Sequence, residues 1–238
     1  MAEQQQRRVP APLARGWDWL QERVDIQAAI QAGLHVTIPR GAKTYFLGGT
    51  TLFFLGTQVI TGVLLTLYYR PSPDGAYESV LYIMNEVRFG WLIRSVHAWS
   101  ANLMIATCVL HMLRVLIQGA YKKPREMTWI VGVGLLLITL GFGFTGYLLP
   151  WDQRAYWATT VSTEIAGAVP LVGDYLLRLM RGGDSLSATT LSRFYGIHTL
   201  VLPLSIAALV AIHLALIHEQ GLASPPSAED GDEEETES

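Results

Sequence analysis

Four of the six histidines in this 238-residue chain stand in the interior of long apolar segments. They form two pairs along the chain, His97 with His111 and His198 with His213, separated by fourteen and fifteen residues. Ionisable side chains in a hydrocarbon environment are costly and usually functional. One such histidine alone is more often a hydrogen-bonded core residue than a metal ligand, but two matched pairs favour ligands.

The spacing within each pair predicts where the rings lie. At about 1.5 Å of rise per residue, the two histidines of one helix are about 21 to 22 Å apart. Fourteen residues are four turns at about 3.5 residues per turn, so His97 and His111 face the same partner, and fifteen residues require only a modest twist. If the two helices run in the same direction, His97 meets His198 at one side, called the far side here, and His111 meets His213 at the other, the near side. The sequence therefore predicts two stacked sites with two imidazole ligands each.

The ligand set favours haem iron. Each site offers two nitrogen ligands, whereas zinc sites use three or four protein ligands. An iron with two axial imidazoles has no open coordination position, which suits electron transfer rather than oxygen activation. The only cysteine, Cys108, lies within an apolar segment and belongs to no Cys-x-x-Cys-His motif. We therefore expect two noncovalent b-type haems.

Glycines on two other apolar segments repeat the same interval. Gly48 and Gly62, and again Gly132 and Gly146, are fourteen residues apart. A flat macrocycle needs neighbours without side chains, so these glycines are candidates for the haem pockets. Glycine is also common in membrane helices, where it permits close helix contact, so one pair alone carries little weight.

Two arginines flank the first histidine pair on its outer sides. Arg94 lies three residues before His97, and Arg114 lies three residues after His111. A guanidinium forms bidentate, charge-assisted hydrogen bonds with a carboxylate, so both arginines are candidates for holding haem propionates. Arginines also anchor helix ends at the membrane interface, and we weigh the two roles equally.

The elements that must position these residues are four transmembrane helices. Hydrophobic residues make up 50% of the chain and charged residues 16%, which is unusually apolar for a soluble domain. Four segments contain no Asp, Glu, Lys or Arg: residues 44–69, 95–113, 127–151 and 194–218. Each can cross roughly 30 Å of hydrocarbon as a helix. We predict an all-α membrane protein in which residues 44–222 form a four-transmembrane-helix, haem-binding bundle.

The segments outside these helices differ in character. Residues 1–43 form an N-terminal segment whose amphipathic part, 17–32, predicts a helix that lies in the membrane interface or docks on a partner subunit. Residues 151–193 contain two weakly amphipathic runs, and residues 223–238 form an acidic tail that we expect to be disordered. Cations before the first span and between the second and third predict that both termini face the cytoplasm.

Several motifs resemble the cytochrome b subunits of bc and b6f complexes. They extend over about residues 17–222 and include Phe89-Gly-Trp-Leu-Ile-Arg-Ser-Val-His, Gly146-Tyr-Leu-Leu-Pro-Trp-Asp-Gln and Arg193-Phe-Tyr-Gly-Ile-His. The fifteen-residue interval and the four spans are similar to the b6 type. In that type the remaining helices, with the Pro-Glu-Trp-Tyr motif that serves quinol deprotonation, belong to a separate subunit. That motif is absent from this sequence.

The resemblance implies a Q-cycle in a quinol-oxidising complex of the membrane. Its expected partners are a three-span subunit carrying the Pro-Glu-Trp-Tyr motif, a Rieske iron-sulfur protein and a c-type cytochrome, in a dimeric assembly surrounded by lipid. Nucleic acid is not among them, and we expect a bacterial plasma membrane. By motif position, the far-side quinol site should involve Phe144, Tyr147, Trp157 and Ala158, although aromatic residues there are equally suited to an interfacial belt.

Three positions separate this chain from the b6 type. That type has a cysteine before Leu-Gly-Gly that holds an extra haem covalently, whereas this chain has Phe46, so a covalent haem is not expected. Ala98 stands where the b6 type commonly has arginine, which removes one expected propionate contact. His218 stands where the bc type has a histidine at its quinone-reduction site. A histidine can hydrogen-bond a quinone carbonyl and deliver a proton, but an interfacial histidine without such a role is an equal alternative.

Two other classes of protein remain open from the sequence. A di-haem membrane anchor of a quinone-linked dehydrogenase or hydrogenase would have the same histidine pairs without a Q-cycle. A transporter with buried histidine proton relays would bind no haem. The Pro-Trp-Asp and Arg-Phe-Tyr stretches favour the quinol-oxidising complex.

Overall fold

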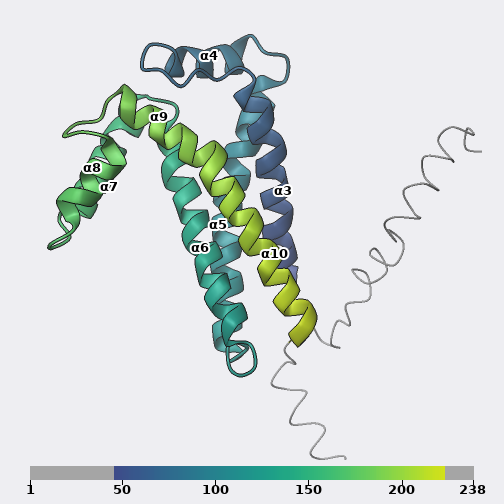
Figure 1. The fold of residues 1–238 in the computed structure, drawn as a ribbon. Helices are drawn as coiled ribbons and strands as arrows, with labels where there is room; N and C mark the ends of the chain where they lie inside the picture. Colours follow the sequence, from purple (N-terminus) through teal and green to yellow (C-terminus); the bar gives the residue numbers. More distant parts are fainter. Residues whose placement is uncertain (1–45, 223–238) are drawn as a thin grey trace, which may run out of the picture. The chain divides into compact units, whose positions relative to one another are not determined.

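The computed structural model describes residues 46–222, and all regular secondary structure in this range is helical (Figure 1). The predicted all-α fold is thus confirmed for this range. The expected interfacial helix within residues 1–43 and the acidic tail at 223–238 lie outside the described residues. In chain order the helices are α3 (Phe46–Thr66), α4 (Ala76–Asn85), α5 (Gly90–Ile117), α6 (Glu126–Leu148), α7 (Gln153–Gly167), α8 (Gly173–Arg181), α9 (Ala188–Gly196), η1 (Ile197–Val201) and α10 (Leu202–Gln220).

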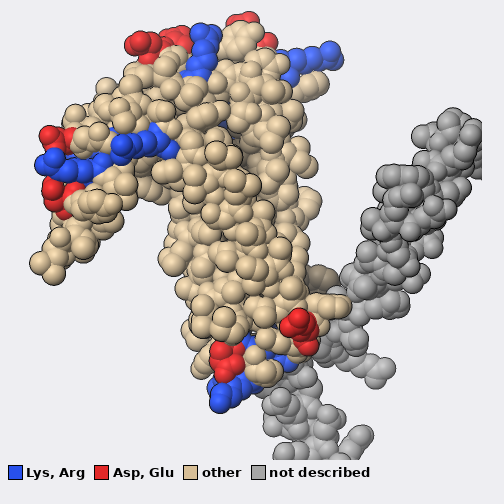
Figure 2. Space-filling model, viewed as in Figure 1, with Lys and Arg blue, Asp and Glu red and all other residues tan. Residues whose placement is uncertain are grey.

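Four helical segments of this range are long and apolar enough to cross a membrane, as the sequence predicted: α3, α5, α6 and the continuous run Ala188–Gln220. Their predicted ends were less accurate. The charge-free stretch 95–113 lies within a helix of 28 residues, because Arg94 and Arg114 extend it into the polar interface, where charged side chains are solvated. Figure 2 shows the same division: charged side chains gather toward the ends and an uncharged surface lies between them.

Each histidine-bearing helix packs against one glycine-bearing helix. The most extensive helix contacts in the described range join α3 to α5 and α6 to α10 (Figure 1). Polar side chains join the first pair inside the membrane region. Gln58 of α3 donates to the carbonyl of His97 at 2.7 Å, and Thr51 donates to Thr107 of α5 at 3.0 Å. These bonds fix the relative position of α3 and α5 along their axes.

The fourth span contains a π-helical turn at its first histidine. His198 lies in η1, between α9 and α10. Pro203 follows at the start of α10, and because proline lacks an N–H and crowds the carbonyl four residues before it, the regular α-helical ladder is interrupted here. A π turn accommodates one extra residue. It therefore takes up the fifteenth residue between His198 and His213, where the sequence suggested a modest twist along the helix.

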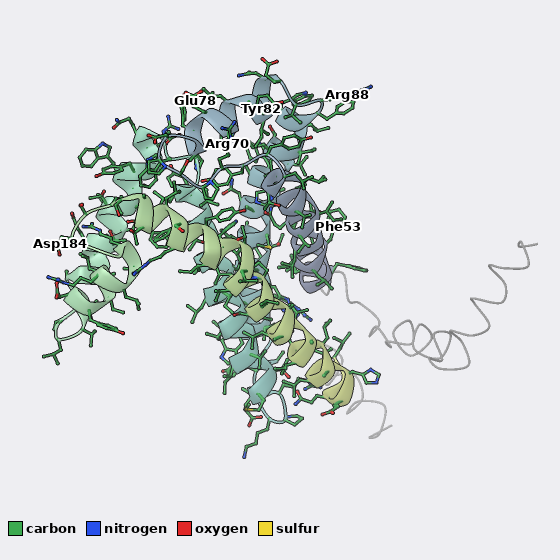
Figure 3. The ribbon with its side chains drawn as sticks, turned by 45° about the horizontal axis from the view of Figure 1, so that its top comes forward. Phe53, Arg70, Glu78, Tyr82, Arg88 and Asp184 are labelled. Carbon is green, nitrogen blue, oxygen red and sulfur yellow. The ribbon has the colours of Figure 1, made fainter. Side chains whose placement is uncertain are left out.

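A short helix that the sequence did not predict covers the far end of the bundle. This helix, α4, packs against α5, and Figure 3 shows Glu78, Tyr82 and Arg88 at this end, whereas Phe53 projects outward from α3. The approach of the two helices requires Gly90, since a Cβ at this position would overlap the carbonyl oxygen of Ile83. This glycine lies within the motif that carried the family resemblance.

The two amphipathic runs between the third and fourth spans form α7 and α8, joined to each other and to α9 by a buried arginine. Arg181 is 5% exposed. Its guanidinium donates to the hydroxyl of Thr163 at 2.7 Å and to the carbonyl of Thr160 at 2.9 Å, and it forms an ion pair with Glu164 at 3.4 Å. Thr190 of α9 donates to the carbonyl of Arg181 at 2.6 Å. The long connection is therefore ordered by hydrogen bonds to one buried cation.

Removing one residue from the π turn tests its role. Deletion of Thr199 shortens the histidine interval to fourteen residues and should convert the π turn into α-helix, so that His198 and His213 keep their directions. Haem content and optical spectra of the purified complex should be retained. Deletion of Asn102 from α5 is the matched control, because it rotates His97 by about 100° relative to His111 and should abolish at least one haem. Equal loss in both deletion variants would contradict this explanation.

Candidate haem sites

The far-side histidines face each other from α5 and η1. The ring centroids of His97 and His198 are 6.5 Å apart, and the ring planes are inclined by 70°. In zinc sites an imidazole nitrogen lies about 2.0–2.1 Å from the metal, so two such nitrogens on opposite sides of one ion are about 4 Å apart. The observed separation of the ring centres fits a single ion between the two rings.

Threonine hydroxyls determine which nitrogen of each far-side ring carries hydrogen. Thr61 Oγ1 lies 2.8 Å from His97 Nδ1, and Thr145 Oγ1 lies 3.0 Å from His198 Nδ1. Each hydroxyl donates its own hydrogen to a carbonyl four residues earlier in its helix, at 2.6 and 2.8 Å respectively. Each hydroxyl oxygen must therefore accept a hydrogen bond from Nδ1–H. A neutral imidazole in this tautomer keeps the lone pair of Nε2 for a metal.

Glycines lie against both far-side rings. A Cβ added at Gly62 would lie 3.3 Å from Cε1 of His97, and one added at Gly146 would lie 2.7 Å from Cε1 of His198. The second distance is shorter than real Cβ contacts allow, so any side chain here would force the ring to move. Glycine is thus required sterically beside His198, and a Cβ beside His97 would also make an unusually close contact.

The near-side pair repeats the arrangement without the hydroxyls. His111 and His213 both line a cavity of about 90 Å³. A Cβ at Gly48 would lie 3.3 Å from Cε1 of His111, and one at Gly132 would lie 3.5 Å from Cε1 of His213. Both Nδ1 atoms of this pair are buried, and no side-chain hydroxyl of the described residues is hydrogen-bonded to them. The four glycines and four histidines therefore meet in the combinations that their spacing suggests.

The residues present fit a haem at each site. Within residues 46–222 no group of three or more His, Cys, Asp or Glu side chains could hold a metal ion, so the donor set is a pair of imidazoles. Two opposed imidazoles suit the axial positions of a haem iron. The adjoining glycines allow the neighbouring helix to approach each imidazole without a side chain between them.

The comparisons with known proteins decide the family. A family model described as Cytochrome b/b6/petB matches residues 35–221. The chain belongs to this cytochrome b family. It is 49% identical to cytochrome b6 of Synechococcus elongatus over 210 residues, which are 88% of this chain and 98% of the relative. It is 45% identical to cytochrome b6 of Prochlorococcus marinus strain MIT 9303 over 210 residues, with 96% of that relative covered.

A solved structure shows the same fold. A chain of a hyperthermophilic respiratory complex III matches with a TM-score of 0.80 and 36% sequence identity. The match covers 88% of this chain and 56% of the solved one, so this cytochrome b spans little more than half the length of that chain. The predicted resemblance to cytochrome b subunits is confirmed by both kinds of comparison.

A second cavity lies at the far face of this cytochrome b, between α6 and α7. Its volume is about 180 Å³, and it is lined by Gly143, Phe144, Tyr147, Ala158, Thr159 and Ser162. Three of the four residues expected at the far-side quinol site are thus brought together. Trp157 is not among the lining residues. Its side chain is 59% exposed, and its Nε1 donates to Gln153 at 3.1 Å along α7.

At the far end of the bundle, Tyr69 contacts the end of α6 and Tyr195 of α9. The hydroxyl of Tyr69 donates to the carbonyl of Leu149 at 2.6 Å, and its ring stacks on Tyr195 with centroids 5.5 Å apart. Burial, and to a lesser extent the neighbouring Tyr195, raises the pKa of Tyr69. The phenol therefore stays protonated across the physiological pH range and serves as a permanent hydrogen-bond donor to the end of α6.

The remaining candidates from the sequence occupy different surroundings. Arg114 lines the near-side cavity beside His111. Arg94 lies on the far side, with Nη1 3.7 Å from the sulfur of Met84. His218 is exposed and does not belong to the lining of the near-side cavity. The roles of these three side chains toward propionates and quinone stay predictions.

The spacing of histidines and glycines did not indicate the two threonines, although the sequence contains a signal for them. Thr61 and Thr145 each stand directly before the glycine that faces the same histidine, Gly62 or Gly146. A small hydroxyl residue beside a glycine in a span with a facing histidine could have been recognised as a hydrogen-bond acceptor for the ring.

The glycine contacts predict unequal effects of the same substitution on one helix. Gly146→Ala should displace His198 and destabilise the far-side haem by about 1–3 kcal/mol, the usual cost of overpacking. Gly132→Ala should have little effect on the near-side haem, because its Cβ would make an ordinary contact with His213 at 3.5 Å. Loss of each haem during denaturant titration, followed by absorption, measures both. Equal sensitivity of the two variants would show that the glycines do not act through these rings.

Proposed function

We propose that His97 and His198 are the axial ligands of one b-type haem near the far face, and that His111 and His213 are those of a second near the opposite face. The chain is a cytochrome b subunit of a quinol oxidoreductase complex in the membrane. The observation that carries the haem assignment is the pairing of each histidine with a glycine on the adjacent helix, together with the 6.5 Å separation of the far-side rings.

Each haem, when bound, would supply reversible one-electron transfer without an open coordination position. The protein residues hold and orient it. The histidines would provide the nitrogen ligands, and the glycines let the neighbouring helix approach each imidazole without a side chain between them. Arg94 and Arg114 are placed on the outer sides, where propionates would need cations. With about 21 Å of helical rise between the ligand levels, the two sites would carry electrons across much of the bilayer.

The far-face cavity is the proposed site of quinol oxidation. Phe144, Tyr147 and Ala158 line it, and Trp157 lies on the adjoining turn of α7, where it would contact an approaching quinol or the membrane interface. A cavity with aromatic walls and a few hydroxyl groups suits a quinone ring. The proposed site of quinone reduction is at the near face, where His218 would deliver a proton.

This function requires partners beyond the chain. We propose a three-span subunit with the Pro-Glu-Trp-Tyr motif, which the present sequence lacks, and a Rieske protein and a c-type cytochrome as electron acceptors in a dimeric complex. A Q-cycle follows, with both termini of this chain at the cytoplasmic side of a bacterial plasma membrane. Because Phe46 stands where the b6 type has the cysteine that attaches its extra haem, we expect no covalent third haem, and the two haems proposed here are noncovalent.

Haem content and ligand replacement test the assignment. The purified complex should contain about two haems per copy of this chain, both extractable with acidic acetone. His97→Leu or His198→Leu should abolish the far-side component, because one axial ligand stabilises the haem too little, and the near-side component should at least partly remain. Absence of a reduced-haem band in the wild-type protein would overturn the proposal. Equal loss of both components in every single variant would contradict the pairing.

The role of His218 is tested by electron transfer rather than by haem binding. His218→Leu should leave both haem spectra unchanged and slow the reoxidation of the near-side haem by quinone, because the proton donor is lost. His218→Gln, which keeps a hydrogen-bond donor but cannot protonate the quinone, is the matched variant and should also be slow. Reoxidation at the wild-type rate in both variants would remove His218 from the mechanism.

A further inference from the structure

The buried guanidinium of Arg181 contacts α7 one helical turn beyond the far-face cavity. Its Nε donates to the hydroxyl of Thr163 at 2.7 Å, and that hydroxyl donates in turn to the carbonyl of Thr159 at 2.7 Å. Thr159 lines the cavity, and both threonines are buried. Two short, consecutive hydrogen bonds therefore join the arginine to the α7 wall of the cavity.

The same guanidinium has further acceptors, which it reaches with its other nitrogens. Nη2 donates to the backbone carbonyl of Thr160 at 2.9 Å, and Nη1 donates to that of Asp184, in the connection after α8, at 3.1 Å (Figure 3). The planar fork of an arginine holds its donors in fixed directions, which a lysine ammonium does not reproduce. A shift or rotation of α7 relative to α8 would break bonds to a buried charged donor, and leaving such a donor unsatisfied costs free energy.

Arg181 is also connected to the α6 wall of the cavity. Its backbone carbonyl accepts from the hydroxyl of Thr190 in α9 at 2.6 Å. The buried ring of Phe194, in the same helix, packs edge to face on Phe144 of α6 with ring centroids 5.3 Å apart, and Phe144 lines the cavity. Both walls are thus connected to one residue that does not itself line the cavity.

The ion pair of Arg181 contributes less to this arrangement than the uncharged acceptors. The side chain of Arg181 is 6% exposed, whereas that of Glu164, 3.4 Å away, is 60% exposed. Water screens a carboxylate that is exposed to this extent, so such a pair adds little free energy. The directions of the hydrogen bonds, rather than neutralisation of the charge, therefore hold α7 in place.

We propose that Arg181 is a positioning residue for the proposed quinol site, where it sets the spacing between the α6 and α7 walls and hence the affinity for quinol. The inference rests on the proposed function. It goes beyond that function by assigning substrate affinity to a residue outside the cavity. A displacement of about 1 Å at a substrate site, caused by a change far from the reacting atoms, can reduce the rate by about a hundredfold, so the loss of one of these bonds is measurable.

Steady-state oxidation of duroquinol by the purified complex, with a c-type cytochrome as electron acceptor, tests this inference. Thr163→Val removes the hydroxyl that accepts from Arg181 at nearly constant volume. It should raise KM for duroquinol by about fivefold with a smaller change in kcat, because binding is weakened more than the chemical step. Thr163→Ser keeps the hydroxyl and should retain the wild-type KM.

Thr160→Val is the matched control on the same helix. The hydroxyl of Thr160 donates along α7 to the carbonyl of Tyr156 at 3.0 Å, and its backbone carbonyl, which accepts from Arg181, is retained in the variant. KM should therefore stay at the wild-type value. Equal KM values in Thr163→Val and Thr160→Val, or a fall in kcat at unchanged KM in Thr163→Val, would overturn the inference.

Two further variants separate position from charge. Arg181→Lys keeps the charge without the planar fork and should raise KM at least as much as Thr163→Val does. Glu164→Gln removes the exposed acid and should leave KM and the pH profile of kcat/KM unchanged. A wild-type KM in Arg181→Lys, or an altered pH profile in Glu164→Gln, would show that the arginine acts through its charge and would overturn the inference. If Arg181→Lys or Thr163→Val does not assemble with normal haem content, the other variant, compared with Thr160→Val, decides the matter alone.

The outcome also separates this inference from the function on which it rests. A wild-type complex that does not oxidise duroquinol contradicts the proposed function. Wild-type turnover whose KM responds to none of the substitutions around Arg181 contradicts only the role of the arginine.

Discussion

The structure depends on one constraint: imidazole rings on one helix must face a surface without side chains on the next. Each histidine level satisfies it in the same way, because α3 offers glycine to α5 and α6 offers glycine to α10. The two glycines of each helix are fourteen residues apart, close to the interval of the histidines that they face. The interhelical bonds of Gln58 and Thr51 maintain the same register between the histidine levels.

Because water is absent from the membrane region, the rule for its polar groups is that hydrogen-bond partners must come from the protein. Threonine follows this rule readily, since its hydroxyl can donate a hydrogen bond to its own helix and still accept one from a neighbouring side chain. At the far-side site this second bond goes to a histidine ring. The same residue thus stabilises the helix pair and selects the ring tautomer, which links helix packing directly to the chemistry of the site.

The far face is organised differently from the transmembrane helices. Its helices α4, α7 and α8 are short, and they are fixed by a close backbone approach at Gly90 and by the hydrogen bonds of Arg181 rather than by long apolar interfaces. A cavity suitable for a small ring molecule lies where α7 meets the end of α6. The proposed haem sites within the bundle and the proposed quinol site at its edge are therefore held by different sets of contacts.

Periodicity alone determined the four spans, the two histidine levels and the glycine positions, because each depends on distances along a single helix. It could not show the π turn, since the direction of His198 depends on how Pro203 interrupts hydrogen bonding in the folded helix. Nor could it show that Thr61 and Thr145 contact the rings, or that Trp157 points away from the cavity that Phe144 and Tyr147 line. Those features depend on the rotation of one helix about another, which only the packed structure decides.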